Sequence, residues 1–211
     1  MKAFDLTFSA PKSVSLFWAF GTPATSSVVS ISVVESADVA LRFLARHAAV
    51  SRQQVDGVRA RVPTAGWAAA TFTHRTSREG DPQLHLHCIV PNVVRRPDGT
   101  HASLDAGPMH VWLKAAGSIF QAELQHRLSQ QLGVGWGPDR NGTRELTGFT
   151  ADQLLVFSKR TQQIEAQLAG GTAEWASPAA RMRANDQASL DTRPRKDTSL
   201  TPEVLRDRWR D

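Results

Sequence analysis

Tyrosine is missing from this sequence altogether. The 211 residues include nine Phe and six Trp but no Tyr. These residues alone therefore cannot complete any reaction that needs a tyrosyl nucleophile. Cysteine is almost as rare, because Cys88 is the only one. A single cysteine excludes an internal disulfide framework and suits a reducing compartment.

Long apolar runs are also lacking. No stretch approaches the roughly 18 apolar residues that indicate a transmembrane helix. The first residues do not carry the apolar segment of a secretory signal peptide. Nothing in the sequence therefore directs the chain to a membrane or to export, and the cytoplasm is the simplest expectation.

The composition that remains is that of a folded, basic protein. Hydrophobic residues make up 41% and charged residues 21%, which is typical of globular domains rather than disordered chains. Lys and Arg number 25 against 20 Asp and Glu, a net charge of +5. This balance favours a polyanionic partner such as nucleic acid, although an Arg-rich, solvated surface would explain it equally well.

The hydrophobic pattern predicts a mixture of strands and helices. Phe4 to Phe8 alternates as a strand almost from residue one, so we expect a domain that is truncated at its N-terminus. A helix should follow, with Ser9 as its N-cap and Pro11 in its first turn. Residues 21–35 favour a loop with weak strand character, and a strongly periodic helix is expected from Ser36 onward.

The rest of the chain continues the pattern. Three further strands are expected, over residues 58–62, 67–74 and 84–94. A long amphipathic helix is expected over residues 113–132, and Thr150 with Gln153 forms a capping box that opens another helix. We therefore expect an α+β domain over residues 1–168, followed by a polar, Arg-rich helical extension over residues 169–211.

The sharpest feature is a group of histidines. His85 and His87 are separated by one residue on an expected strand, so their side chains point to the same face. His74 lies on the preceding strand, and a turn across residues 77–82 would bring it beside them. Three neutral imidazoles leave coordination positions open, which is typical of a substrate-binding metal. We expect a divalent cation here, Mg²⁺ or Mn²⁺ with Zn²⁺ as the alternative, that polarises a phosphoryl oxygen.

Two neighbouring residues bear on this site. A metal-ligating imidazole usually donates its second N–H to a carboxylate, and Asp5 on the first strand is the candidate for that role. Cys88 points to the opposite face from His85 and His87, so we expect a buried thiol rather than a fourth ligand. Exposed strands also carry histidines without any function, which remains the alternative interpretation.

Basic and aromatic residues suggest contacts with DNA. Lys12 and Ser13 stand at the start of the first helix, where backbone amides favour phosphate, and Arg75 and Arg78 flank the histidines in sequence. Bases could stack on three aromatic side chains, those of Trp67, Trp112 and Phe120. The competing interpretation is solvated surface for the basic residues and hydrophobic core for the aromatic ones.

Three segments occur in the order known from one family: Phe4 to Ser15, His74 to His87, and Ala115 to Leu124. Over about residues 4–168, the chain resembles the TrwC/TraI-type conjugative relaxases of the His-hydrophobe-His endonucleases. The resemblance implies a central antiparallel sheet flanked by helices.

The resemblance also implies a reaction, a set of residues and partners. In this family a tyrosine attacks a phosphodiester of single-stranded DNA at a transfer origin, in a metal-dependent, strand-specific nick. His74, His85 and His87 match the metal triad, and Asp5 matches the acidic residue that orients a histidine. Other proteins of the relaxosome are expected as partners.

The departure from the family is the nucleophile. Family nucleophiles are tyrosines on a segment that precedes the Asp5 strand, and this sequence contains neither that segment nor any tyrosine. Two other functions therefore stay open: a non-catalytic fragment that binds single-stranded DNA and metal, and a three-histidine hydrolase that activates water. The hydrolase would need a general base, for which Glu79 is the candidate nearest in sequence.

Overall fold

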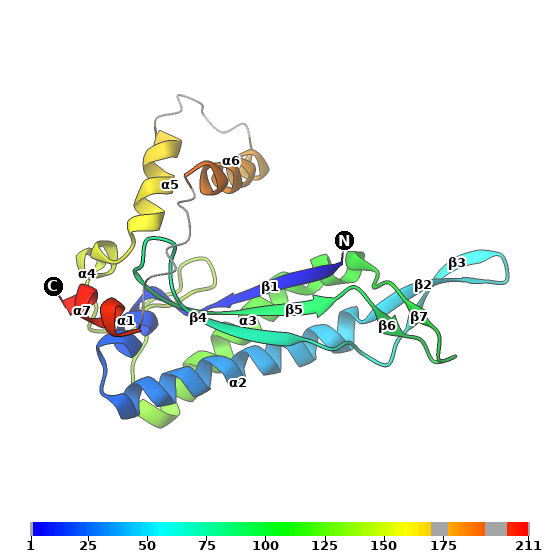
Figure 1. The fold of residues 1–211 in the computed structure, drawn as a ribbon, viewed down its shortest axis with the longest axis horizontal. Helices are drawn as coiled ribbons and strands as arrows, with labels where there is room; N and C mark the ends of the chain where they lie inside the picture. Colours follow the sequence, from blue (N-terminus) through cyan, green and yellow to red (C-terminus); the bar gives the residue numbers. More distant parts are fainter. Residues whose placement is uncertain (1, 170–176, 193–201, 211) are drawn as a thin grey trace. The chain divides into compact units, whose positions relative to one another are not determined.

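The computed structural model describes residues 2–169, 177–192 and 202–210 (Figure 1). The chain forms two compact units, which we call the sheet unit (residues 1–74 and 84–147) and the helical unit (residues 75–83 and 148–211). These bounds differ from the expected division at residue 168, and a functional boundary there stays a prediction.

A three-stranded sheet forms the centre of the sheet unit. Its order is β1 (Ala3–Ser9), β5 (Pro82–Pro91) and β4 (Ala70–Thr76), with β1 antiparallel to β5. Alternate residues of β5 are buried, namely Leu84, Leu86, Cys88 and Val90. The residues between them face the open side of the sheet. The expected α+β class, with an antiparallel sheet flanked by helices, is confirmed.

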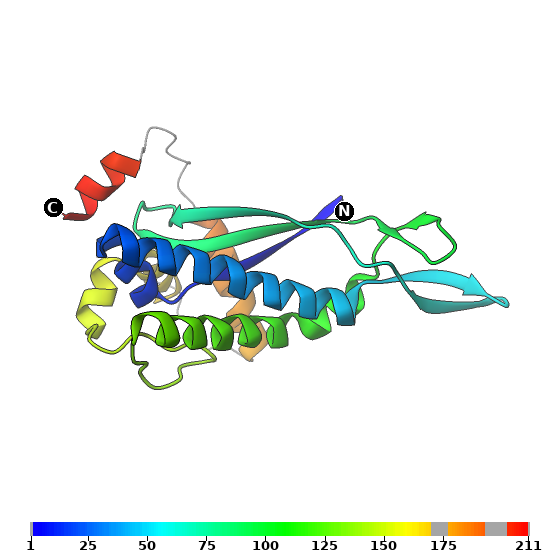
Figure 2. The ribbon, with the colours of Figure 1, turned by 90° about the horizontal axis from the view of Figure 1, so that it is seen from below.

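Two long helices supply the partner for the buried face. α2 (Pro23–Ala48) and α3 (Ala106–Leu132) lie side by side, as Figures 1 and 2 show. The expectation of a loop over residues 21–35 was wrong, because α2 begins at Pro23. Thr22 caps it by accepting a hydrogen bond from the amide of Thr25 (3.2 Å). Burial of one face overrides the weak helix propensity of its β-branched residues.

The start of α1 (Lys12–Phe20) is capped from a distant part of the chain. Ser9 is not its N-cap, because Ser9 ends β1 and Pro11 occupies the cap position without a side-chain hydrogen bond. The carboxylate of Glu145 accepts hydrogen bonds from the Ser13 amide (2.7 Å) and the Ser13 hydroxyl (2.6 Å) instead. No local pattern signals a cap that lies so far along the chain.

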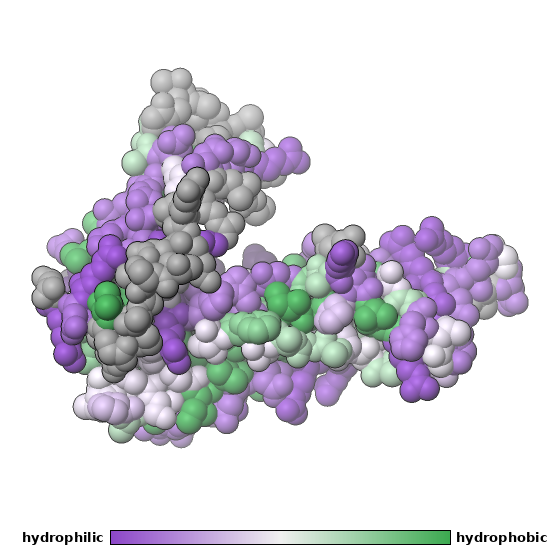
Figure 3. All heavy atoms as spheres, viewed as in Figure 1, coloured by the Kyte–Doolittle hydropathy of each residue, from purple (hydrophilic) through white to green (hydrophobic). Residues whose placement is uncertain are grey.

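A two-stranded ribbon continues from α2. It consists of β2 (Val50–Val55) and β3 (Val58–Pro63), joined by a tight turn at Asp56 and Gly57 whose φ angles are 50° and 80°. Two positive φ values are typical of the type I′ hairpin turn. Figure 3 shows that the surface of this ribbon is mainly hydrophilic. A short pair, β6 (Val94–Arg95) and β7 (His101–Ala102), follows β5.

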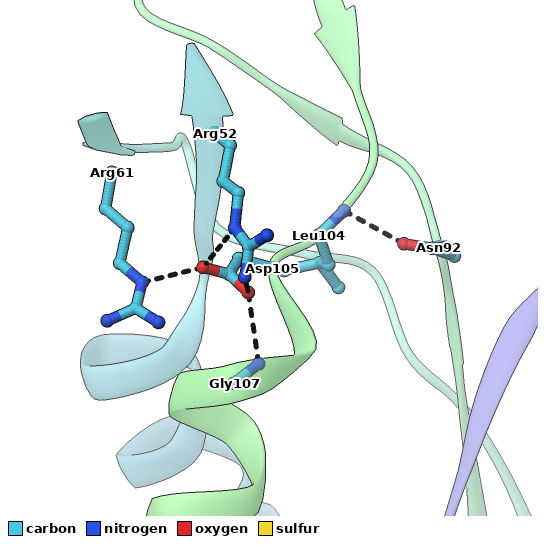
Figure 4. Close-up of polar contacts among 6 residues, drawn as sticks. All are labelled: Arg52, Arg61, Asn92, Leu104, Asp105 and Gly107. Carbon is cyan, nitrogen blue, oxygen red and sulfur yellow. Dashed lines mark hydrogen bonds and ion pairs between the residues drawn. The ribbon is translucent and has the colours of Figure 1, made fainter. Parts of the chain in front are cut away.

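Asp105 joins the ribbon to the start of α3 (Figure 4). Its carboxylate accepts two hydrogen bonds from Arg52 (both 2.9 Å), one from Arg61 (2.6 Å) and one from the Gly107 amide (3.1 Å). Hydrogen bonds from Arg52, then from Arg61 and the helix amide, hold the pKa of Asp105 far below its usual range despite burial. The carboxylate is therefore charged at neutral pH and links three elements.

The helical unit holds the turn between β4 and β5. Its helices are α4 (Ala151–Val156), α5 (Lys159–Ala169), α6 (Pro178–Asp191) and α7 (Pro202–Arg210). The Thr150–Gln153 capping box is present, although the helix it opens ends at Val156. Within this unit, Asp81 accepts a hydrogen bond from the Lys159 amide (2.9 Å). Within the described ranges, no helix is long and apolar enough to cross a membrane.

Candidate metal centre

Three histidines converge on the open face of the central sheet. His74 comes from β4, and His85 and His87 come from β5. Their ligand nitrogens all lie within 4.8 Å of one another. The ring centroids are 5.2 Å apart for His74 and His85, 4.7 Å for His74 and His87, and 5.2 Å for His85 and His87. One ion can therefore contact all three imidazoles.

The period of β5 explains why two of these side chains share a face. His85 and His87 are half-buried, whereas Leu84, Leu86 and Cys88 between and beside them are buried on the opposite face. β4 is the neighbour of β5 in the sheet and brings His74 alongside. His74 is exposed, so the cluster is open to solvent on its side.

The carboxylate of Asp5 lies beside one of the three imidazoles. The Nδ1 atom of His87 lies 2.8 Å and 3.0 Å from the two carboxylate oxygens of Asp5. A proton on Nδ1, donated to this carboxylate, leaves the lone pair on Nε2 and hence a nitrogen able to bind metal. The structure thus places Asp5 at the position that the sequence suggested for it.

Thr7 is a neighbour of the same imidazole that no sequence motif singled out. It lies opposite His87 in the β1–β5 register, and its hydroxyl is 3.3 Å from the same Nδ1 atom. The signal was available, because Thr7 follows Asp5 by two residues on a strand and so shares its face. What the sequence did not reveal was the register that pairs β1 with β5.

The donor set fits a divalent cation. Three neutral nitrogen donors with one supporting carboxylate are a common arrangement for metals that keep open positions. Cys88 cannot complete the set from the other face, since it is fully buried among apolar side chains. Burial, with a smaller contribution from the charge of Asp5, raises the pKa of the Cys88 thiol to about 11. The thiol therefore stays protonated at neutral pH and is a poor ligand.

The four residues suggested for phosphate lie in different settings. The suggestion for Ser13 was wrong, because Ser13 is fully buried and both its amide and its hydroxyl donate to Glu145. Lys12 is half-buried in the first turn of α1. Arg75 and Arg78 are exposed, and Arg75 alternates with His74 along β4 and so faces the other side of that strand.

The three aromatic residues suggested for base stacking differ in their exposure to solvent. Phe120 is 1% exposed and packs against Phe8 with ring centroids 5.3 Å apart, so it belongs to the core and cannot stack on a base. Trp112 is partly exposed and contacts the His47 ring at 4.7 Å. Trp67 is half-buried. Trp67 and Trp112 therefore remain available for stacking on the described surface.

Removal of the Asp5 carboxylate is expected to weaken metal binding. In Asp5→Ala, His87 loses the partner that fixes its tautomer, and affinity should fall about 10- to 100-fold. Titration calorimetry with Mn²⁺ would measure the change. Asp38→Ala, which removes an exposed carboxylate from α2, is the control and should bind as wild type. Equal affinities for wild type and Asp5→Ala would contradict the orienting role.

Known proteins are similar to this chain over almost its whole length. The family model described as TrwC relaxase matches residues 1–211. The multifunctional conjugation protein TraI of Escherichia coli is 31% identical over 218 aligned residues, which cover 98% of this chain. The chain spans only 11% of the length of that relative.

Two solved structures have the same fold as this chain. A metal-free structure of the conjugative relaxase TrwC in complex with oriT DNA superimposes with a TM-score of 0.88 at 31% identity, covering 99% of this chain and 71% of that one. The metal-bound structure of TrwC with oriT DNA gives a TM-score of 0.87 at 31% identity, covering 99% and 69% respectively.

Proposed function

Because the chain belongs to the TrwC relaxase family, we propose that it forms the metal-binding and DNA-binding part of a conjugative relaxase. The substrate is single-stranded DNA at a transfer origin, and the reaction is a strand-specific nick by transesterification. The observation that carries this proposal is the convergence of His74, His85 and His87, with Asp5 behind His87. The TraI relative and the TrwC structures with oriT DNA support it.

The three imidazoles would hold Mg²⁺ or Mn²⁺ while phosphate oxygens fill the open positions. Such a cation supplies Lewis acidity, which polarises the phosphoryl group of the scissile phosphate. Zn²⁺ is the alternative, because imidazole ligands suit it better than they suit Mg²⁺. Competition between these metals for the wild-type chain, read by calorimetry, would decide between them.

Residues of this chain would position the substrate. With its proton on Nδ1, His87 would donate to Asp5 and keep Nε2 available for the metal. The exposed side at His74 leaves room for a DNA strand. Arg75, Arg78 and Lys12 remain candidates for contacts with the DNA backbone, because cationic side chains neutralise phosphate charge.

The nucleophile would come from residues outside this sequence, since the sequence holds no tyrosine. In the proposed reaction, a tyrosine oxygen forms a bond to phosphorus as the bond from phosphorus to the 3′ oxygen breaks. The tyrosine hydroxyl gives up its proton, and the leaving 3′ oxygen takes one up. The products are a 5′-phosphotyrosyl strand and a free 3′-hydroxyl. We place this reaction in the cytoplasm, together with other relaxosome proteins.

A cleavage assay tests the proposal. Labelled single-stranded oligonucleotides from the transfer region are incubated with Mg²⁺ or Mn²⁺ and one of two proteins, the chain itself or the chain extended by its upstream coding sequence. Each protein is also tested with His85→Ala and His87→Ala together. We expect cleavage and a covalent protein–DNA product from the extended form only, and neither from its histidine variant.

Two other results would count against the proposal. Metal-dependent cleavage by the chain alone would favour the three-histidine hydrolase, in which Glu79 or another base activates water. Glu79 is half-buried in the turn between β4 and β5, whereas the carboxylate bonded to the histidine cluster is that of Asp5. Metal and DNA binding without cleavage in every form would favour a non-catalytic binding protein.

A further inference from the structure

A shallow pocket, largely open to solvent, lies on the sheet unit and shares no residue with the histidine cluster. Residues 65–68, which lead from the ribbon into β4, form one wall. Val93, the two residues of β6 and His101 of β7 form the other. Its volume is about 310 Å³, at the lower end of the range of roughly 300–1,000 Å³ found for ligand pockets. The pocket is therefore of a size for one small group, such as a nucleotide.

Backbone hydrogen bonds hold the pocket in shape. The amide of Ala65 donates to the carbonyl oxygen of Arg95 (2.9 Å) and so ties the two walls together. The hydroxyl of Thr64 donates to the carbonyl oxygen of Ala49 (2.6 Å) and accepts from the amide of Gly66 (3.3 Å). Gly66 has φ = 98°, which other residues rarely adopt. A preformed pocket binds with little loss of conformational entropy.

The side chains around the pocket combine an aromatic surface with one cation, that of Arg95. Trp67 is half-buried on one wall, and Val93 on the other wall is 50% exposed. Arg95 and His101 lie opposite each other in the register of β6 and β7, and both are exposed. Bases of single strands stack on indole rings, and guanidinium groups pair with phosphate. This combination suits a nucleotide better than it suits an uncharged apolar ligand.

The acidic residue closest to the pocket in sequence is bonded within its own turn. Asp98 lies in the turn between β6 and β7, and its carboxylate accepts hydrogen bonds from the amide (2.9 Å) and the hydroxyl (2.7 Å) of Thr100. Hydrogen bonds from Thr100, with a smaller contribution from the charge of Arg96, lower the pKa of Asp98, so the carboxylate stays charged and is held within the turn. Arg95 remains exposed at the pocket wall.

We propose that this pocket binds one unpaired nucleotide of a DNA strand, with the base against Trp67 and a phosphate against Arg95. The inference rests on the proposed function, which supplies the DNA partner. It adds a contact point on the β6–β7 side of the sheet unit that the histidine cluster does not provide.

Two fluorescent probes with equal numbers of phosphates separate base contacts from phosphate contacts. One is an oligothymidylate, and the other is an abasic strand of the same length, each titrated with the chain by fluorescence anisotropy. Trp67→Ala should weaken binding of the oligothymidylate about tenfold and leave binding of the abasic strand unchanged. Trp67→Phe, which keeps an aromatic ring, should retain most of the affinity.

Arg95→Gln tests the phosphate contact. The variant should bind both strands more weakly, by a similar factor. It should also reduce the slope of log affinity against log salt concentration by about one. Arg46→Gln removes one positive charge from an exposed position on α2. It should leave the affinity for both strands unchanged. Circular dichroism of each variant would establish that the fold is retained.

The outcomes distinguish this pocket from the function on which it rests. If Trp67→Ala bound oligothymidylate like wild type, the nucleotide pocket would be refuted, while the cleavage assay could still support the relaxase. If Trp67→Ala lost affinity for the abasic strand to the same degree, Trp67 would have a structural role. That result would also overturn the inference. If the wild-type chain bound neither strand, the DNA-binding part of the proposed function would fail as well.

Discussion

Mn²⁺ binding is expected to be lost when His85 and His87 are both replaced by alanine. The double variant leaves His74 as the one imidazole of the cluster, on the exposed strand β4. A single imidazole in water cannot hold a divalent cation against solvation. Loss of one outer-shell partner alone costs about 10- to 100-fold in affinity, so the loss of two direct ligands should exceed about 100-fold. Calorimetry would measure the loss of affinity.

A thermal measurement provides an independent test of the same variant. A ligand that binds the folded chain raises its stability in proportion to the logarithm of ligand concentration over Kd. Mn²⁺ should therefore raise the melting temperature of wild type and leave that of the double variant unchanged. The matched control replaces His110 and His126, two exposed histidines of α3, and should respond like wild type. Wild-type affinity in the His85/His87 variant would rule out the cluster as the metal site.

Replacing Asp105 by alanine should lower the free energy of unfolding by about 3 kcal/mol. Removal of one partner from a buried ion pair costs about 3–5 kcal/mol, and the variant also loses the side-chain N-cap of α3. The Asp105 side chain is 3% exposed, whereas Arg52 and Arg61 are 49% and 57% exposed. Water can therefore solvate the two guanidinium groups, which favours the low end of that range.

Urea unfolding would measure this change. Asp38→Ala is the control, because Asp38 pairs with Arg42 on the surface of α2, where the side chains are 54% and 78% exposed. An exposed pair of this kind contributes less than about 1 kcal/mol. Equal losses for the two variants would show that the Asp105 cluster does not anchor the ribbon to α3.

The same cluster makes stability depend on acidic pH. The pKa of Asp105 is lowered in the folded chain by hydrogen bonds from Arg52, then from Arg61 and Gly107. The unfolded state therefore binds the proton more readily, and acid favours unfolding. The stabilisation is present above the unfolded pKa of about 3.9 and is lost as pH falls from there toward the folded value. Asp105→Asn should flatten the stability curve below about pH 4, and parallel curves for variant and wild type would contradict this account.

Local patterns accounted for the strands that carry the histidines. The single-residue spacing of His85 and His87 requires a common face once the segment is extended, because side chains alternate along a strand. Alternation also predicted that Cys88 would be buried on the opposite face, where it lies. The capping box at Thr150 is another purely local signal, and it is present.

Contacts between distant segments decided the rest, and here the sequence-based expectations failed. Residues 23–35 became helix because packing of α2 against α3 outweighs the strand preference of their β-branched side chains. Ser13 cannot contact a phosphate, because its amide donates a hydrogen bond to Glu145, which lies 132 positions away in the sequence. For Phe120 the core interpretation holds, because its ring packs against that of Phe8.

The histidine centre itself combines the two kinds of information. The spacing of His85 and His87 was enough to place both on one face of a strand, since that depends only on neighbouring residues. The position of Asp5 against His87 depends on the antiparallel register of β1 with β5, which pairs residues about 80 positions apart. Pairing at that range is stabilised by burial of the whole sheet face rather than by any local preference, so only the tertiary structure could determine it.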